Sequence, residues 1–229
     1  MKLAVLSPTL AQTLGMPKPT VNVLAMTLRK AGLISSGGRG RGGAEMTPTD
    51  VTNLLLAAMG GGHAKDAPEV VRRLREATSQ KPAPGPKGPP PILPDLPLLS
   101  AVHTLGAVLD AIFLNYAAEG ELIEEGAGLP ITNMRFAVTF PHRLIYQAEL
   151  WIDTGDDTWT LRYHRNYPDF DLAPKEHWNE IARSLLDGQV DLAFKATITS
   201  KTFYALSEAL GDSGRRHAAE QLQAALCRS

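Results

Sequence analysis

A proline-rich segment at residues 81–97 divides this chain and limits the folds that it can adopt. Eight of its seventeen residues are proline. Proline lacks a backbone amide donor and disfavours helix at the residue before it, so no helix or central strand can continue through this segment. It is therefore predicted to be a semi-rigid linker between an N-terminal domain, residues 1–80, and a C-terminal domain, residues 98–229. The alternative is that the segment itself binds a proline-recognising module.

Charge is distributed unevenly along the chain, although the formal net charge is only −1. Residues 1–46 carry six Lys or Arg side chains and one acidic side chain, a net of +5. Residues 97–229 carry 11 basic and 18 acidic side chains, a net of −7. A basic N-terminal part on an acidic remainder predicts that the N-terminal part alone binds a polyanion.

The composition favours a globular protein of the reducing cytoplasm. Its 44% hydrophobic residues are enough for at least one sizeable core. The single cysteine, Cys227, can form neither an internal disulfide nor a cysteine metal site. No apolar run approaches the roughly 18 residues of a membrane span, and the N-terminus lacks the features of a secretory signal. We therefore expect no membrane contact.

Caps and apolar periodicity predict four short helices before the linker. The first two are joined by Gly15, Met16 and Pro17, a tight connection typical of a helix-turn-helix. Leu33 and Ile34 are expected to start a short strand after the second helix. The predicted helices are residues 8–14, with Ser7 as N-cap and Pro8 in the first turn; 19–31, ending at Gly32; 48–59, with Thr47 as N-cap; and 67–78, with Arg72, Arg73 and Arg75 pointing outward.

The pattern after the linker predicts an α+β domain whose antiparallel sheet is covered on one face. A largely apolar stretch at 98–118 is interpreted as one long helix, buried in the core or against a second subunit. Trp151 falls on the opposite phase to its neighbours and is expected to face a partner or a covering helix. Period-two alternation predicts four strands, at 134–140, 144–152, 159–163 and 190–198, with a hairpin loop at 154–157; helices are expected at 175–187 and from 200 or 201 to 226.

The second helix has two different faces when it is plotted at 100° per residue. One face is apolar and predicted to be buried; it carries Val21, Leu24, Ala25, Leu28 and Ala31. The opposite face mixes hydrogen-bonding, methyl-bearing and cationic side chains, which can contact base edges, thymine methyls and phosphates in a major groove. The candidate DNA-binding residues are Lys18, Thr20, Asn22, Val23, Met26, Thr27, Arg29 and Lys30, together with Arg39 and Arg41 in the following loop.

That loop, "SSGGRGRGGAE", alternates arginine with glycine, so its cations can approach phosphates or a narrow minor groove closely. The run "GRGRGG" also matches the G-x-G-x-x-G pattern of dinucleotide-binding proteins. Such a fingerprint follows a strand and opens a helix, whereas here a helix precedes it and the next helix begins only near Thr47. The remaining interpretations are a wing that contacts DNA and a disordered loop.

The run "LAQTLGMPKPTVNVLAMTLRKAGLI", followed by "SSGGRGRGGAEMTPTD", resembles the winged helix-turn-helix of bacterial and phage transcription regulators. The resemblance covers roughly residues 5–60. It implies that the second helix is the recognition helix and that residues 37–43 form the wing. Such domains usually have a further element before the helix-turn-helix, and the 48–59 helix is expected to complete the core instead.

No other pattern indicates catalysis. The six histidines lack metal-ligand spacing and the acidic clusters suit turns and helix ends, so we expect no enzyme activity, no metal and no cofactor. The predicted function is a double-stranded-DNA-binding transcription regulator of bacterial or phage type that dimerises through residues 98–229 or contacts another protein through this acidic part. The alternatives are a DNA packaging or replication adaptor, similar to a small terminase, and a ligand-sensing or catalytic body that the N-terminal part docks on DNA.

Overall fold

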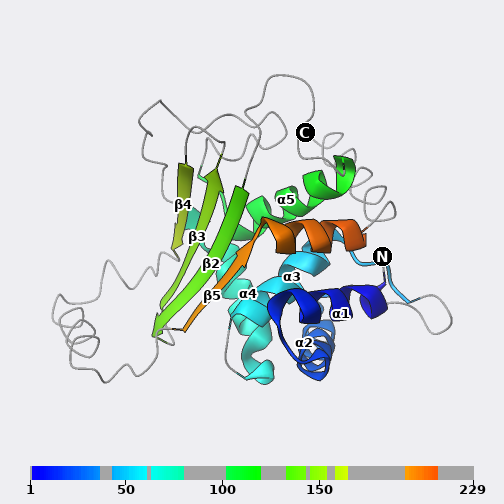
Figure 1. The fold of residues 1–229 in the computed structure, drawn as a ribbon. Helices are drawn as coiled ribbons and strands as arrows, with labels where there is room; N and C mark the ends of the chain where they lie inside the picture. The colour runs from blue at the N-terminus through cyan, green and yellow to red at the C-terminus, as the bar shows by residue number, and fades with distance from the viewer. Residues whose placement is uncertain are drawn as a thin grey trace, which may run out of the picture.

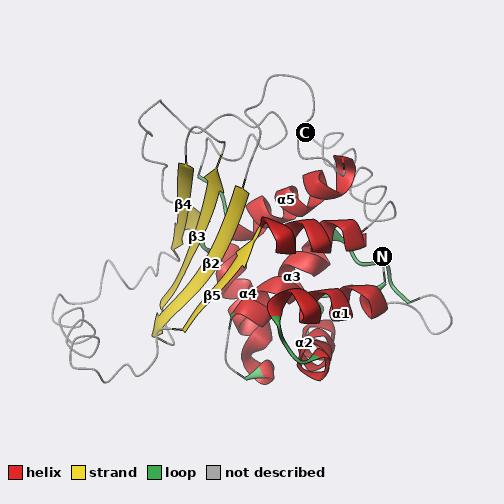
Figure 2. Ribbon diagram, viewed as in Figure 1, coloured by secondary structure: helices red, strands yellow, loops and turns green. Residues whose placement is uncertain are grey.

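The computed structural model describes residues 2–36, 43–60, 63–79, 102–119, 133–142, 145–153, 158–164 and 194–210. These residues form one antiparallel sheet with helices packed on one of its faces (Figures 1 and 2). The predicted α+β class is therefore confirmed. The predicted linker at 81–97, the hairpin loop at 154–157 and the helix at 175–187 lie outside the described residues.

The first helix, α1, spans Leu3–Leu14 and starts five residues earlier than predicted, with Pro8 inside it. Ser7 is therefore a buried helical residue and not an N-cap. The apolar period continues on the N-terminal side of Pro8, because Leu6 and Leu10 lie one turn apart and are both buried. Burial of this face outweighs the hydrogen bond that a proline removes from a helix interior.

The turn between the first two helices lies where the sequence predicts it. Gly15 adopts a left-handed conformation with φ 63°, and the Met16 amide donates to the Ala11 carbonyl at 2.9 Å. The second helix, α2, spans Lys18–Lys30. A second left-handed glycine, Gly32 with φ 71°, follows it.

The third helix, α3, spans Pro48–Met59 and lies at the centre of the helical layer. Its predicted cap is confirmed as a reciprocal capping box between Thr47 and Asp50. Most of its side chains are buried, because α2, α4 and α5 all pack against it. This helix therefore completes the core around α1 and α2, as the sequence suggested.

The segment after α3 departs from the prediction at its end. A short 3-10 helix, η1 (Ala64–Asp66), leads into α4 (Ala67–Glu76), and the chain then forms a two-residue strand, β1 (Thr78–Ser79). The predicted helix thus ends two residues early, because Thr78 pairs with His164 and Ser79 with Tyr163 at the edge of the sheet. A strand of two residues is too short to produce a periodic pattern.

The long helix predicted from residue 98 begins at Leu105, since α5 spans Leu105–Glu119. Two contacts of the described residues explain why α5 starts later than predicted. The Thr104 hydroxyl accepts from the Ala107 amide at 3.2 Å and so caps the first turn. The preceding residues pair with β1 instead, because the Ser79 amide donates to the His103 carbonyl at 2.8 Å.

The sheet contains the four predicted strands and β1, in the order β1-β4-β3-β2-β5. Every described pair is antiparallel, and Leu150 lies opposite both Phe136 and Leu161 on the face that the helices cover. Trp151 lies on the other face, as its phase predicted, with the Arg135 guanidinium 5.6 Å above its ring. The strands are β2 (Asn133–His142), β3 (Ile145–Asp153), β4 (Thr158–His164) and β5 (Phe194–Thr199), and a helix follows at residues 200–210.

One continuous apolar core runs from α1 through α3 and α5 to the sheet and the helix at 200–210. The apolar side chains of α5, from Leu105 to Phe113, are buried inside a single chain, which is the core alternative considered for this helix. The division at 81–97 stays a prediction. The structure adds that the chain on the two sides of this segment is in contact, through β1 with β4 and through α3 and α4 with α5.

Candidate nucleic-acid interface

The two predicted faces of α2 are confirmed. Val21, Leu24, Ala25 and Leu28 are buried against the core, and Ala31, just beyond the helix, is half-buried. The other face is open, and two of its apolar side chains are strongly exposed: Val23 at 50% and Met26 at 58%. The predicted site residues on this helix are placed as follows: Lys18, Thr20, Asn22, Val23, Met26 and Lys30 are exposed, and Thr27 and Arg29 are half-buried.

The cations of α2 are not neutralised within the part of the chain that the structure describes. No described carboxylate forms an ion pair with Lys18, Arg29 or Lys30, and the buried Nε of Arg29 has no hydrogen-bond partner there. Arginines elsewhere contrast with this: Arg73 pairs with Glu69, Arg75 with Asp110 and Arg162 with Glu149. Among the described residues, the positive charge of α2 therefore has no carboxylate partner.

A hydrogen bond from α1 fixes one side chain on the exposed face of α2. The hydroxyl of Ser7, which is only 2% exposed, donates to Asn22 Oδ1 at 2.5 Å. One lone pair of Oδ1 is occupied in this way, while the amide nitrogen and the second lone pair stay available. The sequence interpretation missed this role of Ser7 because it placed the residue at a helix start. The apolar spacing of Leu6, Leu10 and Leu14 was the signal that α1 extends through it.

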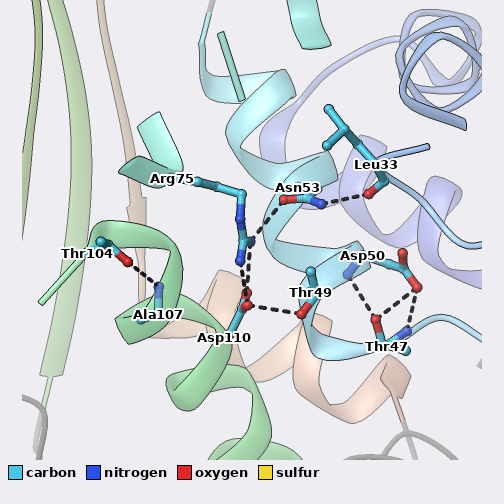
Figure 3. Close-up of polar contacts among 9 residues, drawn as sticks. All are labelled: Leu33, Thr47, Thr49, Asp50, Asn53, Arg75, Thr104, Ala107 and Asp110. Carbon is cyan, nitrogen blue, oxygen red and sulfur yellow. Dashed lines mark hydrogen bonds and ion pairs between the residues drawn. The ribbon is translucent and has the colours of Figure 1, made fainter. Parts of the chain in front are cut away.

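The loop that carries Arg39 and Arg41 lies outside the described residues, but the structure defines where the chain enters it. The predicted strand at Leu33 and Ile34 is absent. The backbone there bonds to α3 instead, with the Leu33 carbonyl accepting from Asn53 Nδ2 at 2.6 Å and the Ser35 amide donating to Asp50 Oδ1 at 2.8 Å. Asp50 and Asn53 are each 3% exposed. The base of this loop is thus attached to the buried helix α3 (Figure 3).

A polar network continues from Asn53 to α5, and the sequence interpretation did not find it. Arg75, which was expected to point outward, turns inward and donates through Nη1 to Asn53 Oδ1 at 3.0 Å. The same guanidinium binds both carboxylate oxygens of Asp110, at 3.1 and 2.7 Å, and Thr49 donates to Oδ2 of that carboxylate at 3.0 Å (Figure 3). Asp110 is 35 residues from Arg75 in the sequence, so no local pattern could reveal the pair.

A second buried polar cluster lies where the residues on either side of the proline-rich segment meet the sheet. His103 Nε2 lies 2.9 Å from the Tyr163 hydroxyl, and the His103 amide donates to the Ser79 hydroxyl at 3.0 Å. Burial raises the pKa of Tyr163 well above its ordinary value. This cluster is closed in by packing, and we assign it a structural role.

Other kinds of site are not found in the part of the chain that the structure describes. No three His, Cys, Asp or Glu side chains gather there as metal ligands. Among the described helices, none has both the length and the apolar character to cross a membrane. No protein-family model, curated protein or solved structure matches this chain.

Proposed function

We propose that the exposed face of α2 binds double-stranded DNA and that the protein is a transcription regulator. The observation that carries the proposal is that one helix after a tight turn combines exposed Val23 and Met26 with cations that no described carboxylate pairs. Val23 and Met26 lie three residues apart on the same face of α2, between its terminal lysines. Methyl and thioether groups can contact thymine methyls, while the cations meet phosphates.

The place of α2 in the molecule suits this role. The helices α1 and α2 lie at the end of the helical layer away from β4, so the sheet does not screen the exposed face of α2 (Figure 1). Lys18 is at one end of the helix and Lys30 at the other. A helix of 13 residues is about 20 Å long, so cations at its two ends reach the phosphates that border a groove about 12 Å wide.

Two further elements belong to the proposal. Arg39 and Arg41, which lie outside the described residues, are proposed to add phosphate contacts. Two copies, associated through residues 98–229, place two such helices on a palindromic site, which makes the second contact effectively intramolecular. Because the apolar face of α5 is occupied within one chain, the contact between copies uses another surface of these residues. Light scattering on the full chain measures this association.

The experiment that tests the proposal is a titration of a duplex over a range of salt concentrations. Each lost phosphate contact makes the negative slope of log K against log salt shallower by about 0.9, so Lys18→Gln with Lys30→Gln is expected to make it shallower by about 1.8. The matched control is Arg162→Gln, which removes the same kind of charge from an exposed position on β4. An unchanged slope in the double variant, or an equal change in the control per charge removed, would refute the interface.

Regulation and a packaging or replication role differ in where the protein lies on the genome. A transcription regulator occupies promoter regions of few genes, whereas an adaptor occupies replication or packaging sites. A genome-wide occupancy map therefore tests this part of the proposal. Peaks confined to a replication origin or a packaging site would contradict the regulatory function and leave the DNA interface in place.

A further inference from the structure

The network that joins α5 to the loop base points to a role for two residues outside the interface itself. We propose that Asp110 and Arg75 are positioning residues for DNA binding: they fix the Asn53 amide, which sets the backbone at the end of α2. This inference rests on the proposed function for its effect on affinity. Its structural part concerns the chain alone and can be tested without DNA.

The chemistry of arginine determines how Asn53 is oriented. A guanidinium can only donate hydrogen bonds, so the atom of Asn53 that faces Arg75 must be the acceptor Oδ1. The donor Nδ2 then points at the Leu33 carbonyl, 2.6 Å away. If Arg75 withdraws, the buried Asn53 Oδ1 loses this hydrogen-bond partner. The amide is then fixed at its Leu33 end by a single bond, so its position against the Leu33 carbonyl is less constrained.

Arg75 is itself fixed by α5. Its guanidinium forms two parallel bonds with Asp110, a geometry that defines direction as well as attraction. The side chains of Arg75 and Asp110 are each 24% exposed, so water screens this pair only in part. Gly106 provides the space: a Cβ there would lie 3.0 Å from Arg75 Cζ and 3.1 Å from Nε. A methyl group at position 106 would therefore require the Arg75 side chain to shift by a few tenths of an ångström.

The effect reaches α2 through Leu33. The Leu33 amide donates to the Leu28 carbonyl at 2.9 Å, and its carbonyl accepts from Asn53, so this one peptide segment joins the end of α2 to α3. Arg29 and Lys30 lie in the last turn of α2, next to this junction. A change in the Asn53 bond therefore alters the backbone at the end of α2. This changes the direction in which the Arg29 and Lys30 side chains point and the direction of the chain at Ser35.

The variant that tests the inference is Asp110→Asn in the full-length chain. It keeps the shape of the side chain but removes the charge that orients Arg75. We expect the backbone amide resonances of Gly32, Leu33 and Ser35 and the Asn53 side-chain amide to shift in the free protein. We also expect affinity for a duplex to fall about three- to tenfold with an unchanged salt slope, because no phosphate contact is removed.

The matched control is Glu69→Gln, which breaks the ion pair of Arg73 on the same helix as Arg75. It is expected to leave the resonances at residues 32–35 and the affinity unchanged. Gly106→Ala is the second variant: it shifts the Arg75 side chain with every charge intact, so it is expected to move the same resonances as Asp110→Asn, even if that variant folds poorly.

Different outcomes overturn different parts of the account. Unchanged resonances at residues 32–35 in both Asp110→Asn and Gly106→Ala would refute the positioning role. A steeper salt slope in Asp110→Asn would also refute it, because the Arg75 guanidinium released from Asp110 would then be contacting a phosphate directly. Shifted resonances in a protein that binds no duplex would refute the proposed function, while the connection from α5 to α2 would stand.

Discussion

Replacing Tyr163 with phenylalanine removes one hydroxyl from the cluster that joins β1, the chain before α5 and the sheet. The ring stays, so no large cavity forms, but the buried Nε2 of His103 loses a partner at 2.9 Å. Loss of a hydrogen-bond partner by a buried polar group costs about 1–3 kcal/mol. We expect the free energy of unfolding at neutral pH to fall by that amount, measured by urea denaturation.

The same substitution changes the dependence of stability on pH. In the unfolded chain a tyrosine ionises near pH 10. Burial raises the pKa of Tyr163 above this value in the folded protein, so the folded state keeps its proton while the unfolded state loses it. Stability from this group is complete below about pH 10 and falls as pH rises further, by about 1.4 kcal/mol per pH unit.

The comparison that isolates this effect is the difference in unfolding free energy between the wild-type chain and Tyr163→Phe at pH 9 and pH 11. This difference is expected to shrink at pH 11, because the variant lacks the group that penalises high pH. Tyr204→Phe is the control, since Tyr204 is 53% exposed. A constant difference across this pH range, or an equal effect of Tyr204→Phe, would refute the reasoning.

Three further predictions follow from the packing. A Cβ at Gly60 would lie only 2.4 Å from Val70 Cγ1, so Gly60→Ala should lower the free energy of unfolding in urea by about 1–3 kcal/mol. Adding Val70→Ala should restore part of the lost stability, and no recovery would contradict the close approach of α3 and α4. Ser7→Ala should free the Asn22 side chain, so the ratio of affinities for a preferred and a random duplex should fall by up to about tenfold while the salt slope stays constant. A changed slope would refute the role of Ser7 in positioning Asn22. A protease site inserted within residues 81–97 should give two fragments that elute together after cleavage, because β1, α3 and α4 contact the C-terminal part; separate elution would show that these contacts are weak.

Sequence periodicity predicted the helices and strands that are long enough for their apolar pattern to repeat. The faces of α2 follow from the helical period, and the strands β2, β3 and β4 follow from period-two alternation over five or more residues; the structure confirms them. The start of α1 was wrong because Pro8 was given more weight than the apolar period on its N-terminal side. A proline is tolerated there once Leu6 and Leu10 bury one face.

The polar network was beyond sequence reasoning for a different reason. On a helical wheel Arg75 lies beside the buried face of α4, four residues after Val71, and it was predicted to point outward because an arginine at such a position is normally solvated. What turns it inward is a gap at Gly106 and a carboxylate at Asp110, both on a helix beyond the proline-rich segment. The predicted interface residues on α2 could be found locally, but the residues that position them depend on tertiary packing.

The most direct measurement of the central claim is a map of the protein surface that contacts DNA. Backbone amide resonances are followed while a short mixed-sequence duplex is added at low salt, where phosphate contacts dominate the binding of any sequence. We predict that the largest changes cluster on Asn22, Met26 and Lys30 of α2 and that the helix at residues 200–210 is unaffected. Changes confined to the sheet or to residues 200–210, or no saturable change at low salt, would contradict the account.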